Sequence, residues 1–276
     1  MLSGCSSRVS EPQPGTYRAV LELPGGEAPF GLEVAIEERH PVLYLTNGSE
    51  RTRVPNVGIV DNELHATFPG YENSLRATMH RDALDGTVTL IKAGGVEQVI
   101  PFKAQLGKTY RFFPDSKTDN ADVAGRWEVT FTDDSGKASR AVALLQQHHD
   151  RVTGTFITAS GDHRFLDGQV HGDELRLSTF AGGLVYLYKL QVTRGGTLEG
   201  EYWQGLNGHE QVSARRNEDA ELEKVETTLA AGTERLDFTF RDLDDNPVAL
   251  SDERFRGKVV LVTLSGTLYG DRKSVV

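Results

Sequence analysis

The sequence has almost no cysteine, because Cys5 is the single one in 276 residues. An internal disulfide and a redox pair of two cysteines are therefore excluded within this chain. No apolar run approaches the roughly 20 residues that a membrane-spanning helix needs. Basic clusters are also lacking, and the net charge of −10 repels polyanions, so the composition argues against nucleic-acid binding.

Glycine, by contrast, is abundant, at 29 of 276 residues against a usual share of roughly 7%. Many tight turns would use these residues, which favours a body made of β-strands. The 38% hydrophobic and 25% charged content is typical of a globular protein. A chain of this length is too long for one ordinary core, so we expect two or three domains.

Short apolar segments separated by turn residues predict a succession of antiparallel strands from Gly15 onward. The segment 42–46 leads into Asn47-Gly48, a pair that tolerates positive φ and so predicts a hairpin. The other strands expected in this first part of the chain are 16–23, 30–36, 51–54, 63–68, 74–80, 87–91 and 97–104.

The second part of the chain resembles the first at an offset of about 110 to 114 residues. Gly125-Arg126-Trp127 parallels Gly15-Thr16-Tyr17, and Leu198-Glu199-Gly200 parallels Leu84-Asp85-Gly86. This spacing is too long for a solenoid repeat and suits a duplicated domain. The sequence therefore predicts a mainly β fold with two antiparallel units, either as two barrels or sandwiches or as one joint barrel.

The expected domain boundaries follow from these patterns. Asp219 to Ala231 is the one stretch with good helical periodicity, and Gly232 would end it. The predicted parts are a tether at 1–13, β-units at 14–113 and 124–215 joined by a linker at 114–123, a helical linker at 216–235, a further partial domain at 236–270 and a non-native tail at 271–276.

Histidines and carboxylates of the second unit are candidate metal ligands: His148, His149, Asp150, Asp162, His163 and His171. Adjacent histidines of a strand point to opposite faces, so a turn at Asp150 explains the first pair better than a shared ion. Asp133-Asp134-Ser135-Gly136 has a calcium-like composition without the loop spacing, so we interpret it as a hairpin turn. We predict no metal and no cofactor.

Six aromatic residues are candidates for the lining of a barrel mouth that binds an apolar ligand, with ordinary core packing as the favoured alternative. They are Tyr17, Trp127, Tyr186, Tyr188, Tyr202 and Trp203. No serine-histidine-acid motif, phosphate loop or paired-carboxylate signature is evident, so no catalytic residue is predicted.

The segment Leu2-Ser3-Gly4-Cys5 resembles a bacterial lipobox, in which the cysteine thiol accepts a diacylglyceryl group. A chance match of four residues is the alternative interpretation. The lipobox interpretation implies a lipid on Cys5, a membrane as partner and a location in the bacterial cell envelope, facing the periplasm or the exterior.

The last part of the chain combines Phe238-x-Phe240, an acidic turn, Val248-x-Leu250-Ser251 and Phe255-x-Gly257-Lys258 followed by the apolar run Val259 to Val262. This order resembles the entry to the thioredoxin-like domain of TlpA-type disulfide reductases and their peroxiredoxin relatives. The segment Gly161 to Gly168 resembles the β-rich region that precedes this domain in some lipoprotein members. The dense apolar and β-branched run Val259 to Leu264 predicts a strand buried on both faces, and the resemblance implies that this strand belongs to an α/β domain.

In that family a Trp-Cys-x-x-Cys motif follows the strand, and a helix start lowers the pKa of its first cysteine. This sequence has Leu268-Tyr269-Gly270-Asp271 there instead, so no thiol activity can be carried over. We therefore interpret the chain as the inactive N-terminal fragment of an envelope thiol-disulfide oxidoreductase whose full-length form has protein thiol or disulfide partners. The alternative is a non-enzymatic β-barrel lipoprotein that acts as a binding or adaptor module.

Overall fold

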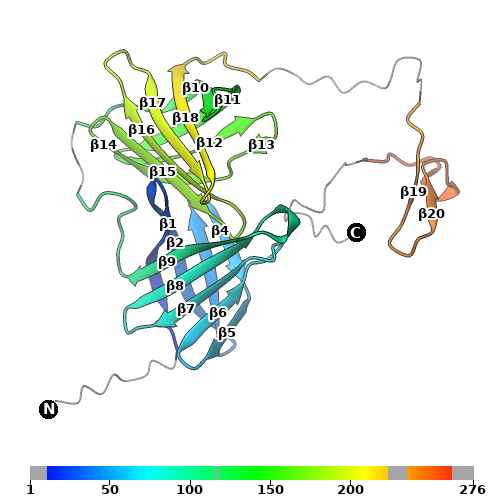
Figure 1. Cartoon of the computed structure of the whole chain (residues 1–276), viewed down its shortest axis with the longest axis horizontal. Helices are drawn as coiled ribbons and strands as arrows, with labels where there is room; N and C mark the ends of the chain where they lie inside the picture. Colours follow the sequence, from blue (N-terminus) through cyan, green and yellow to red (C-terminus); the bar gives the residue numbers. More distant parts are fainter. Residues whose placement is uncertain (1–10, 116, 118, 223–234, 263–276) are drawn as a thin grey trace. The chain divides into compact units, whose positions relative to one another are not determined.

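The computed structural model describes residues 11–115, 117, 119–222 and 235–262. Its described residues fall into two compact units, one comprising residues up to Leu222 and the other the part from 235 to 262. The first unit contains two nine-stranded antiparallel sheets, each rolled into a barrel (Figure 1). The prediction of a mainly β fold with two antiparallel units is confirmed, and the units are two barrels.

Barrel 1 follows the chain from strand to strand with short turns. Its strands are β1 (Gly15–Leu23), β2 (Gly26–Glu37), β3 (His40–Asn47), β4 (Glu50–Val54), β5 (Asn56–Val60), β6 (Glu63–Thr67), β7 (Ser74–Met79), β8 (Ala83–Ile91) and β9 (Glu97–Leu106), with a 3₁₀ turn, η1 (Ala93–Gly95), before β9. The predicted hairpin at Asn47-Gly48 is confirmed, and Gly48 has the positive φ of 57° that such a turn requires.

Barrel 1 is completed by the chain itself. Its ladder runs β4-β3-β2-β1-β9-β8-β7-β6-β5, and β4 and β5 at its two ends are consecutive in sequence. Pro55 joins them, and it cannot donate a ladder hydrogen bond. Residues 50 to 60 therefore act as one strand broken in the middle, whose first half pairs with β3 and whose second half pairs with β6.

Barrel 2 has the same strand order as barrel 1. Its strands are β10 (Gly125–Asp133), β11 (Ala138–His148), β12 (Arg151–Thr158), β13 (Gly161–Asp162), β14 (Leu166–His171), β15 (Glu174–Phe180), β16 (Val185–Val192), β17 (Leu198–Gln204) and β18 (Gly208–Arg216). The ring is closed because β12 pairs with both β11 and β14. Here too the fourth strand is broken, into β13 and β14, so the two barrels share this irregularity.

The two first strands show the same local device. The hydroxyl of Tyr17 donates to the carbonyl of Gln13 at 2.8 Å, and the indole of Trp127 donates to the carbonyl of Val123 at 3.0 Å, four residues earlier in both cases. Both side chains are only 1% exposed and belong to the core of their own barrel. For these two residues the core interpretation holds, not the barrel-mouth one.

The part from 235 to 262 corrects the thioredoxin-like interpretation. Its described residues form a two-stranded hairpin, β19 (Thr239–Arg241) with β20 (Pro247–Ala249), and a 3₁₀ turn, η2 (Glu253–Phe255). Val259 and Leu261 are 103% and 88% exposed and lie in no strand. The expected buried strand is therefore wrong over Val259 to Val262, and with it the α/β domain, because an apolar run becomes a strand only where another strand pairs with it.

Several predictions fall on residues outside the described ranges. These are the lipid site Cys5 with the tether, most of the helical linker and the tail at 271–276. The described part of the helical linker, Asn217 to Leu222, is not helical. Among the described residues no helix is long and apolar enough to cross a membrane.

Candidate functional site

The wall of barrel 2 closes one end of barrel 1. Phe180, Val185, Leu187 and Trp203 lie on the outer face of barrel 2 and belong to the same buried cluster as the core of barrel 1. The ring of Phe180 packs edge-on against Phe30 at 5.1 Å and against Phe68 at 5.2 Å. Barrel 1 thus has no open mouth at this end, and Trp203 is an interface residue.

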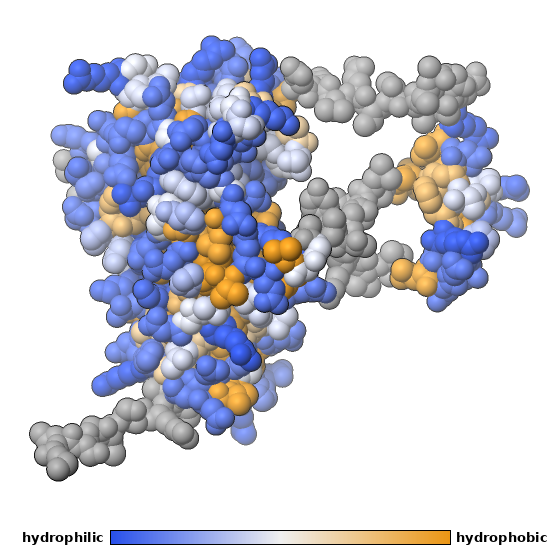
Figure 2. Space-filling view, viewed as in Figure 1, coloured by the Kyte–Doolittle hydropathy of each residue, from blue (hydrophilic) through white to orange (hydrophobic). Residues whose placement is uncertain are grey.

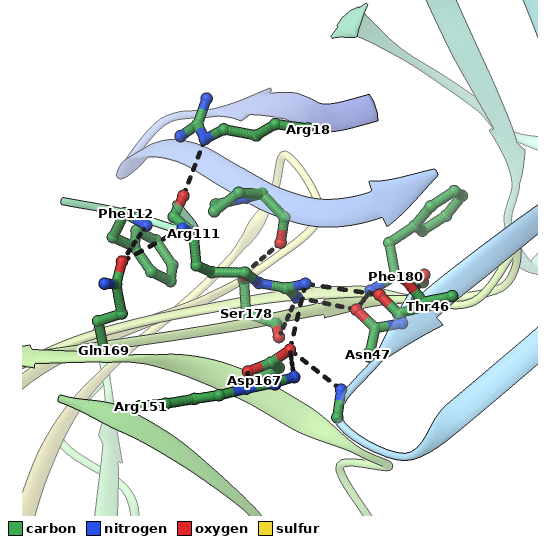
Figure 3. Close-up of polar contacts among 12 residues, drawn as sticks. Arg18, Thr46, Asn47, Arg111, Phe112, Arg151, Asp167, Gln169, Ser178 and Phe180 are labelled. Carbon is green, nitrogen blue, oxygen red and sulfur yellow. Dashed lines mark hydrogen bonds and ion pairs between the residues drawn. The ribbon is translucent and has the colours of Figure 1, made fainter. Parts of the chain in front are cut away.

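A buried polar network accompanies this apolar contact (Figure 3). Arg111, from the connection between the barrels, donates to Asn47 Oδ1 at 2.9 Å and to the Ser178 carbonyl at 3.0 Å. Its guanidinium lies 3.6 Å from the carboxylate of Asp167. Arg151 also pairs with Asp167, at 2.9 Å. Groups of both barrels and of their connection therefore meet around one arginine.

Charge compensation explains how this network remains buried. Burial lowers the pKa of Arg111 to about 10, although the Asp167 carboxylate opposes the shift. Burial alone would raise the pKa of Asp167, but Arg111, Arg151 and the Gly48 amide together lower it. A paired and hydrogen-bonded ion pair of this kind fixes an arrangement, although the Nε of Arg111 is buried without a hydrogen bond. We interpret the Arg111 network as structural.

A second group of buried polar side chains lies inside barrel 2, at one end of its interior. Tyr186, Tyr188 and Tyr202 are at most 5% exposed and point into the barrel from β16 and β17. Three of the six aromatic residues named from the sequence are thus brought together. We call this set, together with His163, Thr179 and Glu210, the tyrosine end.

His163 reaches the tyrosine end because the fourth strand of barrel 2 is broken. The residues Gly161–Phe165, which we call the flap, pair with β12 at only two positions, Ile157 with Asp162 and Thr158 with Gly161. The amide of His163 then donates to the carbonyl of Phe156 at 2.9 Å. Barrel 1 has only Pro55 at the equivalent break, so the flap is specific to barrel 2.

The imidazole of His163 lies across a platform of two tyrosine rings. Its centroid is 4.5 Å from the ring of Tyr186 and 5.3 Å from that of Tyr202, with interplanar angles of 20° and 21°. The two tyrosine centroids are 5.8 Å apart. At the ring edge, Nδ1 shares a hydrogen bond with the hydroxyl of Tyr188. The flat imidazole ring is therefore held by the ring faces of two tyrosines and, at its polar edge, by the hydroxyl of a third.

The electrostatics of the tyrosine end follow from burial. Burial lowers the pKa of His163 to about 4, against a smaller opposite effect of Asp162, so the ring is neutral at pH 7. Burial also raises the pKa of Tyr186 to about 12 and that of Tyr188 and Tyr202 further above the usual value. The pKa of Glu210, the cross-strand partner of Tyr202, is raised by burial and by Asp133.

One polar group of the tyrosine end is left without a partner. Thr179 is 1% exposed and lies on the same face of β15 as the core residues Leu175 and Leu177, opposite Tyr186 on β16. Its hydroxyl makes no hydrogen bond. Buried hydroxyls are rarely left unsatisfied, so this one marks a position where a further polar atom can bind.

The candidate metal ligands are not brought together. The rings of His148 and His149 meet edge to face at 4.5 Å, and His149 has the positive φ of 56° expected in a turn. His171 stacks on Phe113 at 4.6 Å, away from the tyrosine end. Within the described parts of the chain, no group of three or more histidine, cysteine or acidic residues is placed to hold an ion.

The acidic segment Asp133 to Gly136 is the hairpin turn between β10 and β11, as predicted. Asp133 Oδ1 accepts from the backbone amides of Ser135 and Lys137, both at 2.9 Å, and this leaves the loop satisfied by its own residues. The turn also explains the low pKa of Asp133, which its hydrogen bonds to Ser135 and Lys137 lower.

The flap was missed as a site by the sequence analysis, which noted Asp162 and His163 only as candidate metal ligands. The available signal was an interruption: Gly161 to Phe165 carries five residues without apolar alternation between two strands of regular pattern. In such a break the local sequence pattern no longer matches the surrounding β-fold, and mismatches of this kind are concentrated at functional positions.

Comparisons with known proteins give no family. No protein-family model matches the sequence, and no curated protein matches it. Among solved structures, a proposed outer membrane protein from Bacteroides fragilis aligns at 10% identity and a TM-score of 0.23, covering 73% of this chain and 95% of that one. The Myxococcus xanthus hemagglutinin, solved with a mannopentaose, aligns at 13% identity and a TM-score of 0.18, covering 73% of this chain and 88% of that one.

At these TM-scores the two structures identify neither a fold family nor a ligand. The all-β architecture of the described residues, in which Val259 and Leu261 are exposed and lie in no strand, overturns the oxidoreductase-fragment interpretation. The functional argument therefore starts from the residues of this chain.

Proposed function

We propose that this protein is a non-enzymatic binding module and that its ligand site is the tyrosine end of barrel 2. The observation that supports this most strongly is the ring of His163 lying on Tyr186 and Tyr202 with its edge nitrogen bonded to Tyr188. Aromatic faces combined with a few placed polar groups are the usual lining of small-molecule sites. The unpaired hydroxyl of Thr179 adds a polar group that core packing does not require.

A binding role suits these groups better than catalysis. The tyrosine hydroxyls have pKa values raised by burial, so they remain protonated and are poor nucleophiles at neutral pH. His163, with a pKa of about 4, is a weak base. Hydrogen bonding and stacking are what the tyrosine end offers.

The rigid frame around the site supports the same role. Barrel 1 and barrel 2 share a buried cluster, and Arg164 of the flap forms an ion pair with Glu50 of barrel 1. The flap is thus attached to both barrels. The tyrosine platform on β16 and β17 is part of this frame, and tyrosine rings that are already in place limit the entropic cost of binding a ring.

We also propose that the protein is anchored in the cell envelope by a lipid on Cys5. This rests on the lipobox-like sequence alone, and the measurement is metabolic labelling with a radioactive fatty acid. Label is expected on the wild-type chain and absent from Cys5→Ser. Equal labelling of both would contradict the anchor and leave the binding proposal untouched.

The binding proposal is tested on the wild-type protein by saturation-transfer NMR with a set of small ring compounds: phenol, indole, benzimidazole and adenine. Transfer to at least one of them is expected, with loss in the double variant Tyr186→Leu/Tyr202→Leu. The matched control is Tyr44→Leu, a buried tyrosine of barrel 1 outside the site. Absence of transfer to all four, or equal transfer in the double variant, would refute the proposal.

A further inference from the structure

Apart from the ring of His163, which contacts the tyrosine end, the flap is held in place by few contacts. It has two ladder positions on β12, one further backbone bond from His163 and the ion pair between Arg164 and Glu50. Gly161 and Asp162 are exposed, and the apolar side chain of Phe165 is 50% exposed. Segments with little buried area open at a low cost in free energy compared with the core strands around them.

The backbone at Arg164 adds strain to the flap. Arg164 has a φ of 56°, a conformation that residues with a side chain adopt at a cost. The ion pair that would offset this cost is incomplete, because Arg164 Nε and Glu50 Oε2 are buried without a hydrogen bond. Strain and unsatisfied polar atoms both lower the free energy needed to release the flap.

What lies under the flap is already shaped for a ring. The imidazole rests on Tyr186 and Tyr202, is bonded at one nitrogen to Tyr188 and is surrounded by Phe131 and Phe156 with centroids 5.9 and 6.5 Å away. All of these contacts are non-covalent, so a free ring of the same shape can make them as well as the side chain of His163. The hydroxyl of Thr179 remains available for a second polar atom.

We propose that the His163 ring is a displaceable stand-in for the true ligand and that this ligand is a small planar nitrogen heterocycle, bound in neutral form. When the flap releases, a free heterocycle takes the position of the imidazole. It stacks on the tyrosine platform and bonds to Tyr188 through a ring nitrogen, while a second polar atom reaches Thr179. This inference rests on the proposed function and adds its ligand class and its gate.

The neutral form follows from the surroundings. The same burial that disfavours a charged His163 ring acts on any ring in its place. Of the acidic groups, the exposed Asp162 acts on the ring itself, and Glu210, whose pKa burial raises, acts on Tyr188 and Tyr202. A strongly basic heterocycle would lose its hydration without gaining a full ion pair, so weakly basic rings are preferred.

The inference is tested by replacing the built-in ring with a free one. His163→Gly removes the side chain, and 4-methylimidazole reproduces it. Added at tens of millimolar, this compound is expected to raise the melting temperature of His163→Gly by roughly 5 °C and to leave His163→Leu unchanged, because leucine fills the space. The full-length chain is used throughout.

His163→Ala is measured beside His163→Gly so that backbone flexibility cannot decide the result. Two results for the melting temperature would overturn the inference: an equal rise in His163→Leu, or no rise in either His163→Gly or His163→Ala. A smaller variant that stays unfolded in the presence of 4-methylimidazole, while His163→Leu folds, would overturn it as well. Failure here with ring binding intact in the wild type leaves the binding function standing. Rescue here with no ring binding in the wild type refutes the function instead.

Discussion

At the scale of single residues, His163 and Arg111 show two different uses of a buried basic side chain. Arg111 stays charged because Asp167 and several carbonyl groups compensate it. His163 has no such counter-ion in hydrogen-bond contact and is kept neutral by burial. One residue therefore fixes the two barrels together, and the other fills a site that a ligand can take.

The neutral state of His163 predicts a dependence of stability on pH. The folded-state pKa of about 4 lies below the unfolded value of about 6.5, so the unfolded chain binds the extra proton between these values. The wild type should thus lose up to ~3 kcal/mol relative to His163→Gln as the pH falls from 6.5 to 4. Urea unfolding at four pH values measures this, and the control His80→Gln, which changes an exposed position and keeps His163, should lose as much stability as the wild type.

The Arg111 network predicts a large effect from one substitution. Arg111→Met leaves the buried Asp167 carboxylate with Arg151 as its remaining partner, and we expect a loss of about 3 kcal/mol in the free energy of unfolding. The double variant Arg111→Met/Asp167→Leu should recover most of it. The control Arg53→Met breaks an exposed pair with Glu37, which solvent screens, and should cost much less than Arg111→Met. Equal losses for both arginines would contradict the buried-network interpretation.

At the scale of elements, the fourth strand of each barrel is the informative one. Period-2 alternation and turn residues predict most strands within a few residues, because both are local properties. The segment 56–60 was missed because Pro55 hides a strand that continues on another partner. The flap was missed as a site because the stacking of His163 on Tyr186 and Tyr202 depends on contacts between β13, β16 and β17, which no local pattern reveals.

The incorrect strand at Val259 to Val262 has the same explanation. Its β-branched residues have the composition of a buried strand, but pairing and coverage are properties of the whole fold. Phe238 and Phe240, also part of the resemblance, instead lie at a short hairpin, with Phe240 in β19 and the two rings tilted by 37° at a centroid distance of 5.0 Å. Composition predicted that this segment favours a strand, but it could not predict whether a neighbouring strand would pair with it.

Close strand packing predicts an element-level test. A Cβ added at Gly168 in β14 would lie 1.8 Å from the carbonyl oxygen of Arg176 in β15, so the two strands would have to separate. Gly168→Ala should cost about 2 kcal/mol or more. Gly58→Ala in β5, where an added Cβ meets no atom within 4 Å, is the matched control and should be neutral or slightly stabilising. Chemical denaturation compares the two, and similar losses would contradict the assigned strand contact.

At the scale of the whole molecule, the two barrels of the first unit behave as one folding unit in this account. The residues that fill the end of barrel 1 come from the outer wall of barrel 2. The face shown in Figure 2 is mainly hydrophilic, with apolar residues in limited groups, whereas the apolar residues of the cores and of this contact are buried.

This shared cluster predicts that damage in barrel 2 reaches barrel 1. Phe180→Ala should cost about 3 to 5 kcal/mol, because it leaves a cavity beside Phe30 and Phe68. Hydrogen exchange should then speed up in β2 and β6 of barrel 1 as well as in β15. Exchange that changes in barrel 2 alone would show that the barrels unfold independently.

The central claim is that the tyrosine end binds a planar ring and that His163 occupies it until such a ring arrives. NMR titration of ¹⁵N-histidine in the wild-type protein tests this most directly, with and without saturating pyrazole, a planar nitrogen heterocycle that stays neutral across the titrated range. Without the compound, His163 should titrate with a pKa of about 4. With it, the pKa should rise to the ordinary value of about 6.5, because the displaced ring enters water. A His163 pKa that stays at about 4 in the presence of a concentration that stabilises His163→Gly would contradict the account.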